Sequence, residues 1–393
     1  MKHLVLALCA ACWMMAQAPT AGGLAKAALE KGEAWASREG DFLFAIVSAK
    51  EPRIVVDEGA AAKMSREGDK WVYRTKLRTG AIHRFHYLID GAPFGGKNDV
   101  PAFTAMHYEA AGVPQGTLTE KIVHKSKIYD GMESDYWVYT PAQYKPGTPA
   151  AVMIWQDGQG LVERNGGARL QNVIDHLIHH GKMPVSIHIF IAPGKIGERA
   201  MRSVEYDTVT DRYGRFIRDE ILDEVSRKWT LRADAYSRAI AGNSSGGICA
   251  FNAAWMMPRE FSRVLSRIGS FTSIQWKPGE LDGGNVYPNK IRKEPKRNIR
   301  VWLQDGSEDL ENNHGSWPLQ NIQMANSLKL RDYDFHLSWS HGTHNGGHGN
   351  AESPEALAWL WRGYDPAKTE DNFDADPAEK SKPFYRIKSL NRE

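Results

Sequence analysis

Apolar and polar positions along the chain follow two different patterns. After a polar segment at 25–39 that favours a helix, the first pattern consists of short apolar runs separated by turn signals at Gly68, Gly80 and Gly91. Short strands divided by glycine turns are typical of a small β-sandwich. The pattern therefore predicts a β-sandwich over residues 38–105, with strands at 42–47, 53–56, 70–76 and 83–89.

From residue 121 onward, apolar runs alternate with helical stretches. Strands that alternate with helices of this length require a mainly parallel sheet with helices on both faces. The sequence therefore predicts an α/β domain over 121–366, preceded by a linker at 106–120 and followed by a polar C-terminal tail at 367–393. The predicted strands lie at 135–139, 151–155, 186–191, 237–241, 300–303 and 334–339, and the predicted helices at 171–180, 213–228, 247–256, 317–331 and 355–361.

The first 18 residues have the pattern of an export signal. A short basic start precedes an apolar run at 4–15, and Ala16 and Ala18 supply the small residues that a signal peptidase requires. This run is too short to cross a bilayer as a helix, and no other run approaches about 18 apolar residues. We therefore expect a signal peptide at 1–18, no membrane span, and a secreted or periplasmic product. Cys12 leaves lipoprotein anchoring as an alternative.

The amino-acid composition mainly excludes certain classes of protein. Of the 393 residues, 42% are hydrophobic and 25% are charged, which is typical of a folded chain and excludes wholesale disorder. Lysine and arginine (50) nearly balance aspartate and glutamate (47), and no basic run is interleaved with aromatics, so nucleic-acid binding is not expected. Cys249 is the only cysteine beyond the signal, so we expect no intramolecular disulfide and interpret Cys249 as a buried packing residue.

The sharpest chemical signal is the G-x-S-x-G motif at 242–246. It follows an apolar run and precedes a predicted helix. Glycines on either side of the serine allow the helix to pass close to the strand, so that the hydroxyl stands exposed on a tight turn. Ser244 is therefore the candidate nucleophile.

A serine hydroxyl needs a neighbouring base, which is itself held by a carboxylate, and in α/β-hydrolases these follow in the order serine, acid, histidine. Asp309 is the preferred acid because it completes a G-x-x-D pattern after a strand, whereas Asp305 and Glu308 suit turn positions. Three histidines after the last predicted strand are candidate bases: His341, His344 and His348. Glycines between them predict a loop, and no cysteine or carboxylate pattern completes a zinc set, so neither a metal nor another cofactor is expected.

Acyl transfer also requires backbone amides that stabilise the developing oxyanion. The amide of Ser245, directly after the nucleophile, is one expected donor, and Gly158 or Gln159, after the strand at 151–155, is the second. Arg202, Glu205 and Tyr206 form a further candidate set for substrate binding, because ligands of open α/β sheets bind on the loops after the strands. An Arg202–Glu205 ion pair that serves only as scaffold is the alternative interpretation.

Several stretches of the chain carry a family resemblance: WQDG at 155–158, RSVEY at 202–206, RAIAGNSSGG at 238–247, LQDGSED at 303–309, GTH at 342–344 and WLW at 359–361. Residues 123–364 resemble the bacterial putative esterases related to enterochelin esterase and to the feruloyl esterases of the carbohydrate esterase group. The resemblance implies an α/β-hydrolase fold with Ser244 as nucleophile, Asp309 as acid and His344 as base, and leaves His348 as the alternative base. The preceding strands resemble an immunoglobulin-like early-set domain.

The leading hypothesis is a secreted serine esterase that works through an acyl-enzyme on a small-molecule or carbohydrate-linked ester. Feruloyl, acetyl-sugar and siderophore esters are the substrate classes that the resemblance implies. Two alternatives remain: an acyltransferase that uses the same triad, and a non-catalytic binding protein on a hydrolase fold. The run Arg267-Ile-Gly-Ser270 departs from the serine-glycine-serine run of the family, so a different pocket near Ser270 is expected.

Overall fold

The computed structural model describes residues 18–386, so the predicted signal peptide lies outside the described residues except for its last position. The described chain divides into two units. The first contains the chain up to Arg78 together with Phe85–Lys97, and the second contains Thr79–Arg84 and the chain from Asn98 onward. Within residues 18–386, no helix has the length and apolar character needed to cross a membrane.

Two four-stranded sheets, in the orders β1-β2-β6-β5 and β4-β3-β7-β8, build the first unit, except that the start of β7 (81–84) and the end of β8 (98–102) belong to the second unit. They meet through aromatic rings, since the centroids of Phe44 and Phe85 lie 4.7 Å apart and the Tyr87 hydroxyl donates to the Ala45 carbonyl at 3.2 Å. An immunoglobulin-like identity for this pair of sheets stays a prediction. The strands are β1 (Ala34–Arg38), β2 (Asp41–Ile46), β3 (Arg53–Val56), β4 (Ala62–Lys63), β5 (Ser65–Glu67), β6 (Lys70–Lys76), β7 (Ala81–Ile89) and β8 (Ala92–Ala102).

Two features of this unit differ from the sequence pattern. The polar segment at 25–39 is only partly helical: α1 (Lys26–Lys31) stops at Gly32, whose φ of 68° is left-handed, and β1 follows. A glycine in this conformation ends a helix without the steric penalty that a side chain would add. The pattern also missed β8, because proline and paired glycines are rare inside strands.

The second unit is built on a large sheet of order β15-β14-β11-β13-β12-β16-β17-β18-β21, with β9 and β10 paired to β11. From β13 to β21 every neighbouring pair is parallel, whereas β11 runs antiparallel to β13. The strands are β9 (Thr117–Leu118), β10 (Ile122–Lys125), β11 (Glu133–Thr140), β12 (Ala151–Gln156), β13 (Ser186–Ile191), β14 (Lys195–Ile196), β15 (Arg199–Ala200), β16 (Arg238–Asn243), β17 (Arg263–Arg267), β18 (Arg300–Gly306) and β21 (Asp334–Ser340).

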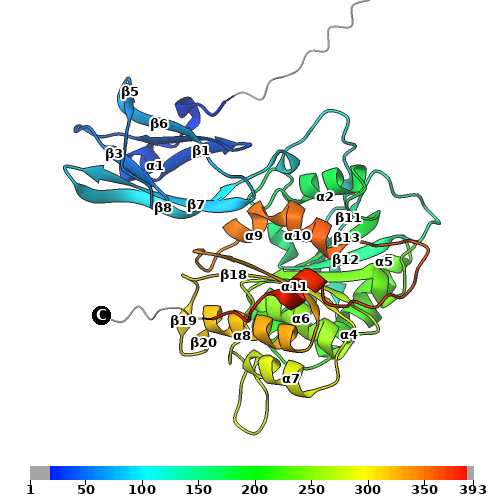
Figure 1. Ribbon diagram of the computed structural model, residues 1–393. Coiled ribbons are helices and arrows are strands. Elements are labelled where there is room, and N and C mark those ends of the chain that lie inside the picture. The colour runs from blue at the N-terminus through cyan, green and yellow to red at the C-terminus, as the bar shows by residue number, and fades with distance from the viewer. Residues whose placement is uncertain (1–17, 387–393) are drawn as a thin grey trace, which may run out of the picture. The chain divides into compact units, whose positions relative to one another are not determined.

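Helices cover both faces of this sheet (Figure 1). In β12, Val152 and Ile154 pack into one core with α6, α7 and α8, while Met153 and Trp155 pack into the other with α2 and α10. Alternate residues of a central strand thus bury opposite sides, which is why the strand is apolar throughout. The helices are α2 (Leu170–His179), α3 (Arg202–Tyr206), α4 (Arg212–Phe216), α5 (Leu222–Ser226), α6 (Ser245–Met256), α7 (Tyr287–Lys293), α8 (Trp317–Leu330), α9 (Gly347–Ala351), α10 (Ser353–Leu360) and α11 (Pro377–Ser381).

The strand β17 was not predicted, although it lies in the middle of the sheet. Arginines stand at both of its ends, and both are buried. The Arg263 guanidinium lies over the rings of Tyr236 and Trp361, each within 5 Å of the ring centroid, and Arg267 donates to the Ser353 hydroxyl at 3.0 Å. Charged residues normally mark exposed positions, so only the tertiary contacts make this strand central.

The boundaries of the second unit are wider than the predicted 121–366. Within the predicted linker at 106–120, His107 is buried and its Nε2 lies 2.9 Å from the Asn350 carbonyl oxygen. In the predicted tail at 367–393, Phe373 is buried against Tyr236, and α11 follows. Both segments lack a regular apolar period because single anchor residues, rather than a continuous face, attach them to the unit.

Candidate active site

Ser244 lies on the tight turn between β16 and α6. Its backbone has a φ of 57°, a left-handed value that is costly for any residue other than glycine. Gly242 is required two residues earlier, because a Cβ at that position would lie 2.4 Å from the carbonyl oxygen of Gly246. The turn therefore places the Ser244 side chain at the carboxyl edge of the sheet, where it lines a cavity.

His344 connects Ser244 to Asp309. Its Nε2 lies 2.8 Å from Ser244 Oγ, and its Nδ1 lies 2.5 Å from Asp309 Oδ1. Burial alone would raise the pKa of Asp309, but hydrogen bonds from His344 and Asp305 hold this pKa below its ordinary value. The acid is therefore ionised and can orient the imidazole and stabilise its protonated form. The three residues meet although 100 positions separate Ser244 from His344.

His348, the alternative base, lies elsewhere. Its Nδ1 contacts Ser340 Oγ at 3.0 Å and the Gln304 amide at 3.1 Å, and its Nε2 lies 3.3 Å from Glu352 Oε2. The ring is buried behind the loop rather than directed at Ser244. Within the described part of the chain, no group of His, Cys, Asp and Glu side chains has the arrangement of a metal site.

The two other acidic residues of the β18 loop have different surroundings. Glu308 is exposed and forms an ion pair with Arg84 at 2.8 Å. Asp305 is fully buried, and burial together with its hydrogen bond to Asp309 raises its pKa to about 10. Two carboxyl groups form a hydrogen bond only when one carries a proton, so Asp305 is the protonated partner and Asp309 the carboxylate.

The backbone amides that were predicted to stabilise the oxyanion lie in different surroundings. Ser245 begins α6 directly after the nucleophile, where amides point out of a helix N-terminus. Gly158 is pressed against β13, since a Cβ on it would lie 2.3 Å from the Ile191 nitrogen, and Gln159 is exposed. In this segment the described cavity lining consists of residues 155–157, 160 and 161. An oxyanion role for the Gly158 or Gln159 amide stays a prediction.

Of the candidate substrate-binding set, Arg202 reaches the cavity. Its guanidinium forms a two-point ion pair with Asp157, with Nε to Oδ1 at 2.7 Å and Nη2 to Oδ2 at 2.8 Å, and 38% of the side chain is exposed. Among the described residues, its ion-pair partner is thus Asp157 rather than Glu205. Glu205 is buried and accepts from the Gly194 amide at 2.7 Å, and burial raises its pKa to about 7. Tyr206 is buried as well and accepts from the Asp157 amide at 3.2 Å. Glu205 and Tyr206 therefore support the loop rather than line the cavity.

The cavity beside Ser244 has a volume of about 520 Å³, and its wall combines apolar residues such as Trp155, Leu161 and Ile268 with a larger number of polar side chains. Apart from Ser244 and His344, its polar side chains are mostly amides, together with the Asp157–Arg202 ion pair. These polar groups can bind oxygen atoms of a ligand, beside an apolar part of the same wall. The polar residues are Gln156, Asp157, Arg202, Asn243, Arg267, Asn345 and Asn350.

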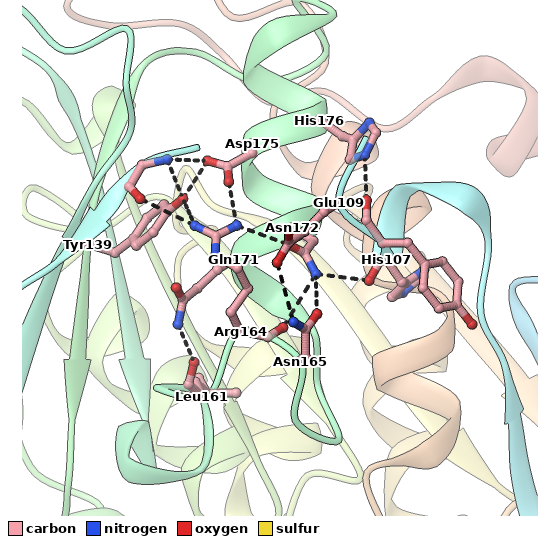
Figure 2. Close-up of polar contacts among 12 residues, drawn as sticks. His107, Glu109, Tyr139, Leu161, Arg164, Asn165, Gln171, Asn172, Asp175 and His176 are labelled. Carbon is pink, nitrogen blue, oxygen red and sulfur yellow. Dashed lines mark hydrogen bonds and ion pairs between the residues drawn. The ribbon is translucent and has the colours of Figure 1, made fainter. Parts of the chain in front are cut away.

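One wall of the cavity is a loop between β12 and α2 that a buried polar network holds in place (Figure 2). Arg164 forms an ion pair with Asp175 at 2.7 Å and donates to the Tyr139 hydroxyl at 3.1 Å. Gln171 donates to the Val162 carbonyl at 2.7 Å. These bonds satisfy the polar groups of a long, non-repetitive segment and keep its cavity-lining part fixed.

The Asp175→Ala variant should test this anchor. Removing the carboxylate leaves the mostly buried Arg164 cation without its counter-ion, so we expect a loss of about 3 kcal/mol in the free energy of unfolding. Chemical denaturation at neutral pH is the measurement. Asp223→Ala is the matched control, because it breaks the exposed Arg227–Asp223 pair and should leave the denaturation midpoint unchanged. Equal midpoints for Asp175→Ala and wild type would contradict the anchoring role.

A parallel sheet flanked by helices, with a serine on the strand–helix turn and an aspartate and a histidine on later loops, defines an α/β-hydrolase. The family description Putative esterase matches residues 131–353, more than half of the chain. The chain therefore belongs to this family and is a carboxylic ester hydrolase.

Solved structures share the fold at low sequence identity. The enterobactin esterase FES from Shigella flexneri is 16% identical, with a TM-score of 0.56 over 84% of this chain and 96% of that one. The ferric enterobactin esterase from Salmonella typhimurium is 15% identical, with a TM-score of 0.55 over the same shares of the two chains. A CE1 ferulic acid esterase from the fungus Anaeromyces mucronatus is 14% identical, with a TM-score of 0.51 over 65% and 94%. A search of the curated proteins found no match.

Sequence reasoning missed two neighbours of the catalytic side chains. Ser270 Oγ lies 3.2 Å from Ser244 Oγ and accepts from the Trp317 indole at 3.1 Å. The Trp317 ring packs edge-on against His344, with centroids 5.6 Å apart. The unusual run before Ser270 was a signal that the pocket differs there, but nothing local pointed to Trp317.

Proposed function

We propose that this protein is a serine esterase that acts through an acyl-enzyme. Ser244 Oγ attacks the ester carbonyl carbon while His344 Nε2 takes the hydroxyl proton, and His344 then gives this proton to the leaving alcohol. A water molecule, deprotonated by the same nitrogen, attacks the acyl carbon and releases the acid and Ser244. The single observation that carries the proposal is the unbroken chain of short contacts from Ser244 through His344 to Asp309.

In this proposal, backbone amides stabilise the tetrahedral oxyanion. The Ser245 amide begins a helix of 12 residues, whose N-terminal dipole favours negative charge. A second amide is expected from Gly158 or Gln159, after a small shift of that segment when substrate binds. Asp305 contributes by keeping Asp309 ionised through its own proton.

For the substrate we infer an ester with several oxygen atoms on the acyl or the alcohol side. The side-chain amides of the cavity wall can form hydrogen bonds with hydroxyl groups of a sugar or of a hydroxylated aromatic acid. The Arg202 guanidinium can do the same, because its ion pair with Asp157 uses only part of its N–H donors. The structural neighbours are named for enterobactin and ferulic acid, which both carry phenolic oxygens. Feruloyl, acetyl-sugar and siderophore esters therefore form the first substrate panel.

We also propose that the mature protein is exported, on the strength of the N-terminal signal pattern. Cell fractionation and N-terminal sequencing of the native protein would test this. A mature start after residue 18 supports export, a lipid-modified Cys12 supports anchoring, and an intact Met1 in the cytoplasm contradicts both.

A two-part experiment tests the catalytic proposal. The first part is labelling with a fluorophosphonate, which reacts only with an activated serine: wild type should be labelled and Ser244→Ala should not. The second part measures release of acid from the ester panel with and without added alcohol acceptors. Hydrolysis that an acceptor does not divert supports the serine esterase, dominant transfer to the acceptor indicates an acyltransferase, and absence of both labelling and turnover contradicts the proposed serine mechanism.

A further inference from the structure

The loop that carries His344 is held by a carboxylate from far away in the sequence. Asp99 lies near the end of β8, and 244 positions separate it from Thr343. It lies outside the residues matched by the family description, 131–353, and the sequence pattern gave it no role. Its side chain is 7% exposed, so its contacts are largely shielded from water.

Three hydrogen bonds join Asp99 to the residues on either side of His344. The Thr343 amide donates to Asp99 Oδ1 at 3.0 Å, and the Thr343 hydroxyl donates to Oδ2 at 2.5 Å. The Asn345 amide group donates to the same Oδ2, also at 2.5 Å. Hydrogen bonds to an ionised acceptor are about twice as strong as neutral ones, so the carboxylate fixes both neighbours of the histidine.

Close backbone packing adds to these bonds. A Cβ on Gly347 would lie 2.6 Å from the Asp99 carbonyl oxygen, so the loop approaches β8 as nearly as a glycine permits. The loop has little regular structure of its own, since α9 begins only at Gly347. Apart from Asp99, the His344 ring is held by Ser244, Asp309 and Trp317, whereas the other hydrogen bonds described for Thr343 and Asn345 lie within the loop itself, such as Asn345 to Thr343.

From these contacts we infer that Asp99 is a positioning residue for the catalytic base, holding the His344 imidazole in line with both Ser244 and Asp309. The inference rests on the proposed function. The contacts of His344 at 2.8 Å and 2.5 Å tolerate little displacement. A shift of about 1 Å in a catalytic group can lower the rate by about a hundredfold.

The test compares Asp99→Ala with Asp90→Asn in the full chain. Asp90 lies between β7 and β8, has the same left-handed backbone and is exposed in a pair with Lys50, which makes it a matched control. For a small chromogenic ester, Asp99→Ala should lower kcat roughly ten- to hundredfold with little change in KM. Fluorophosphonate labelling should slow in parallel, and Asp90→Asn should change neither.

A spectroscopic measurement separates positioning from a merely structural role. The proton between His344 Nδ1 and Asp309 should give a low-field proton resonance in wild type that is absent in His344→Gln. In folded Asp99→Ala this resonance should broaden or shift. Normal kcat with an unchanged resonance would overturn the inference, as would a kcat loss that merely follows a lost fraction of folded protein.

Thr343→Val provides a milder variant if Asp99→Ala does not fold. It removes the hydroxyl bond to Asp99 and keeps the amide bond, so kcat of the folded protein should fall several-fold while the melting temperature falls by less than in Asp99→Ala. Unchanged kcat in Thr343→Val would count against the inference. If Ser244→Ala keeps its activity, the proposed function itself fails; if Ser244→Ala is inactive and Asp99→Ala is normal, only the role of Asp99 fails.

Discussion

Ser244→Ala is expected to lose ester hydrolysis by several orders of magnitude, because no other group can take over the attack on the carbonyl carbon. The fold should not suffer. The hydroxyl faces the cavity, and alanine and serine have the same steric cost at a φ of 57°. Steady-state turnover of a chromogenic acetate ester and a thermal melt are the two measurements.

Ser270→Ala is the matched comparison for that experiment. Its hydroxyl lies 3.2 Å from Ser244 Oγ, but the His344 Nε2 contact described goes to Ser244, so loss of the Ser270 hydroxyl should cost less than about tenfold in kcat. A Ser244→Ala variant that retains more than about a hundredth of wild-type turnover would contradict the assignment of the nucleophile. Equal losses in the two variants would make Ser270 a second candidate.

The second large effect is expected at His344. His344→Gln should lose activity almost as completely as Ser244→Ala, because glutamine cannot take the proton from Ser244 and pass it to the leaving alcohol. His348→Gln should keep kcat within about tenfold of wild type in its folded fraction, since His348 is bound to Ser340 and Gln304 and has no route to Ser244.

The pair of variants is informative because both histidines lie on the same glycine-rich segment. The His348 variant should show its effect in stability, through loss of the buried contacts with Ser340 and Glu352. Circular dichroism melts would detect that effect separately from activity. Near-normal turnover in His344→Gln together with collapse in His348→Gln would transfer the role of base to His348.

Local patterns predicted the alternating strands and helices of the second unit with small errors at their ends. The predicted strand at 186–191 coincides with β13, and the predicted helix at 171–180 is shifted by one residue from α2. Such elements are visible because each buries a continuous apolar run or face. The predicted helix at 213–228 is interrupted in the structure by a π-helical turn at Ile217–Ile221, which the apolar spacing does not reveal.

The sequence-based predictions were wrong where a segment is buried without a continuous apolar run or face. Buried arginines made β17 look like an exposed segment, and glycines and two prolines made β8 look irregular. Single buried residues such as His107 and Phe373 attach segments that were predicted to be a linker and a tail. In each case the stabilising partner lies far away in the sequence. No local window contains both halves of these interactions.

By itself, the sequence determined the nucleophile turn at 242–246, because the glycine spacing of that motif is a local steric requirement. It also determined the alternation of strands and helices and the order of serine, acid and histidine along the chain. The motif spacing left three histidines open and only the family resemblance favoured His344, which the tertiary structure places against Ser244. Only the tertiary structure revealed that Arg202 pairs with Asp157 and that Asp99 is hydrogen-bonded to the His344 loop. Each of these contacts joins segments that are far apart in the sequence and become neighbours only when the sheet and its loops assemble. The local sequence pattern contains no information on the distance between such segments.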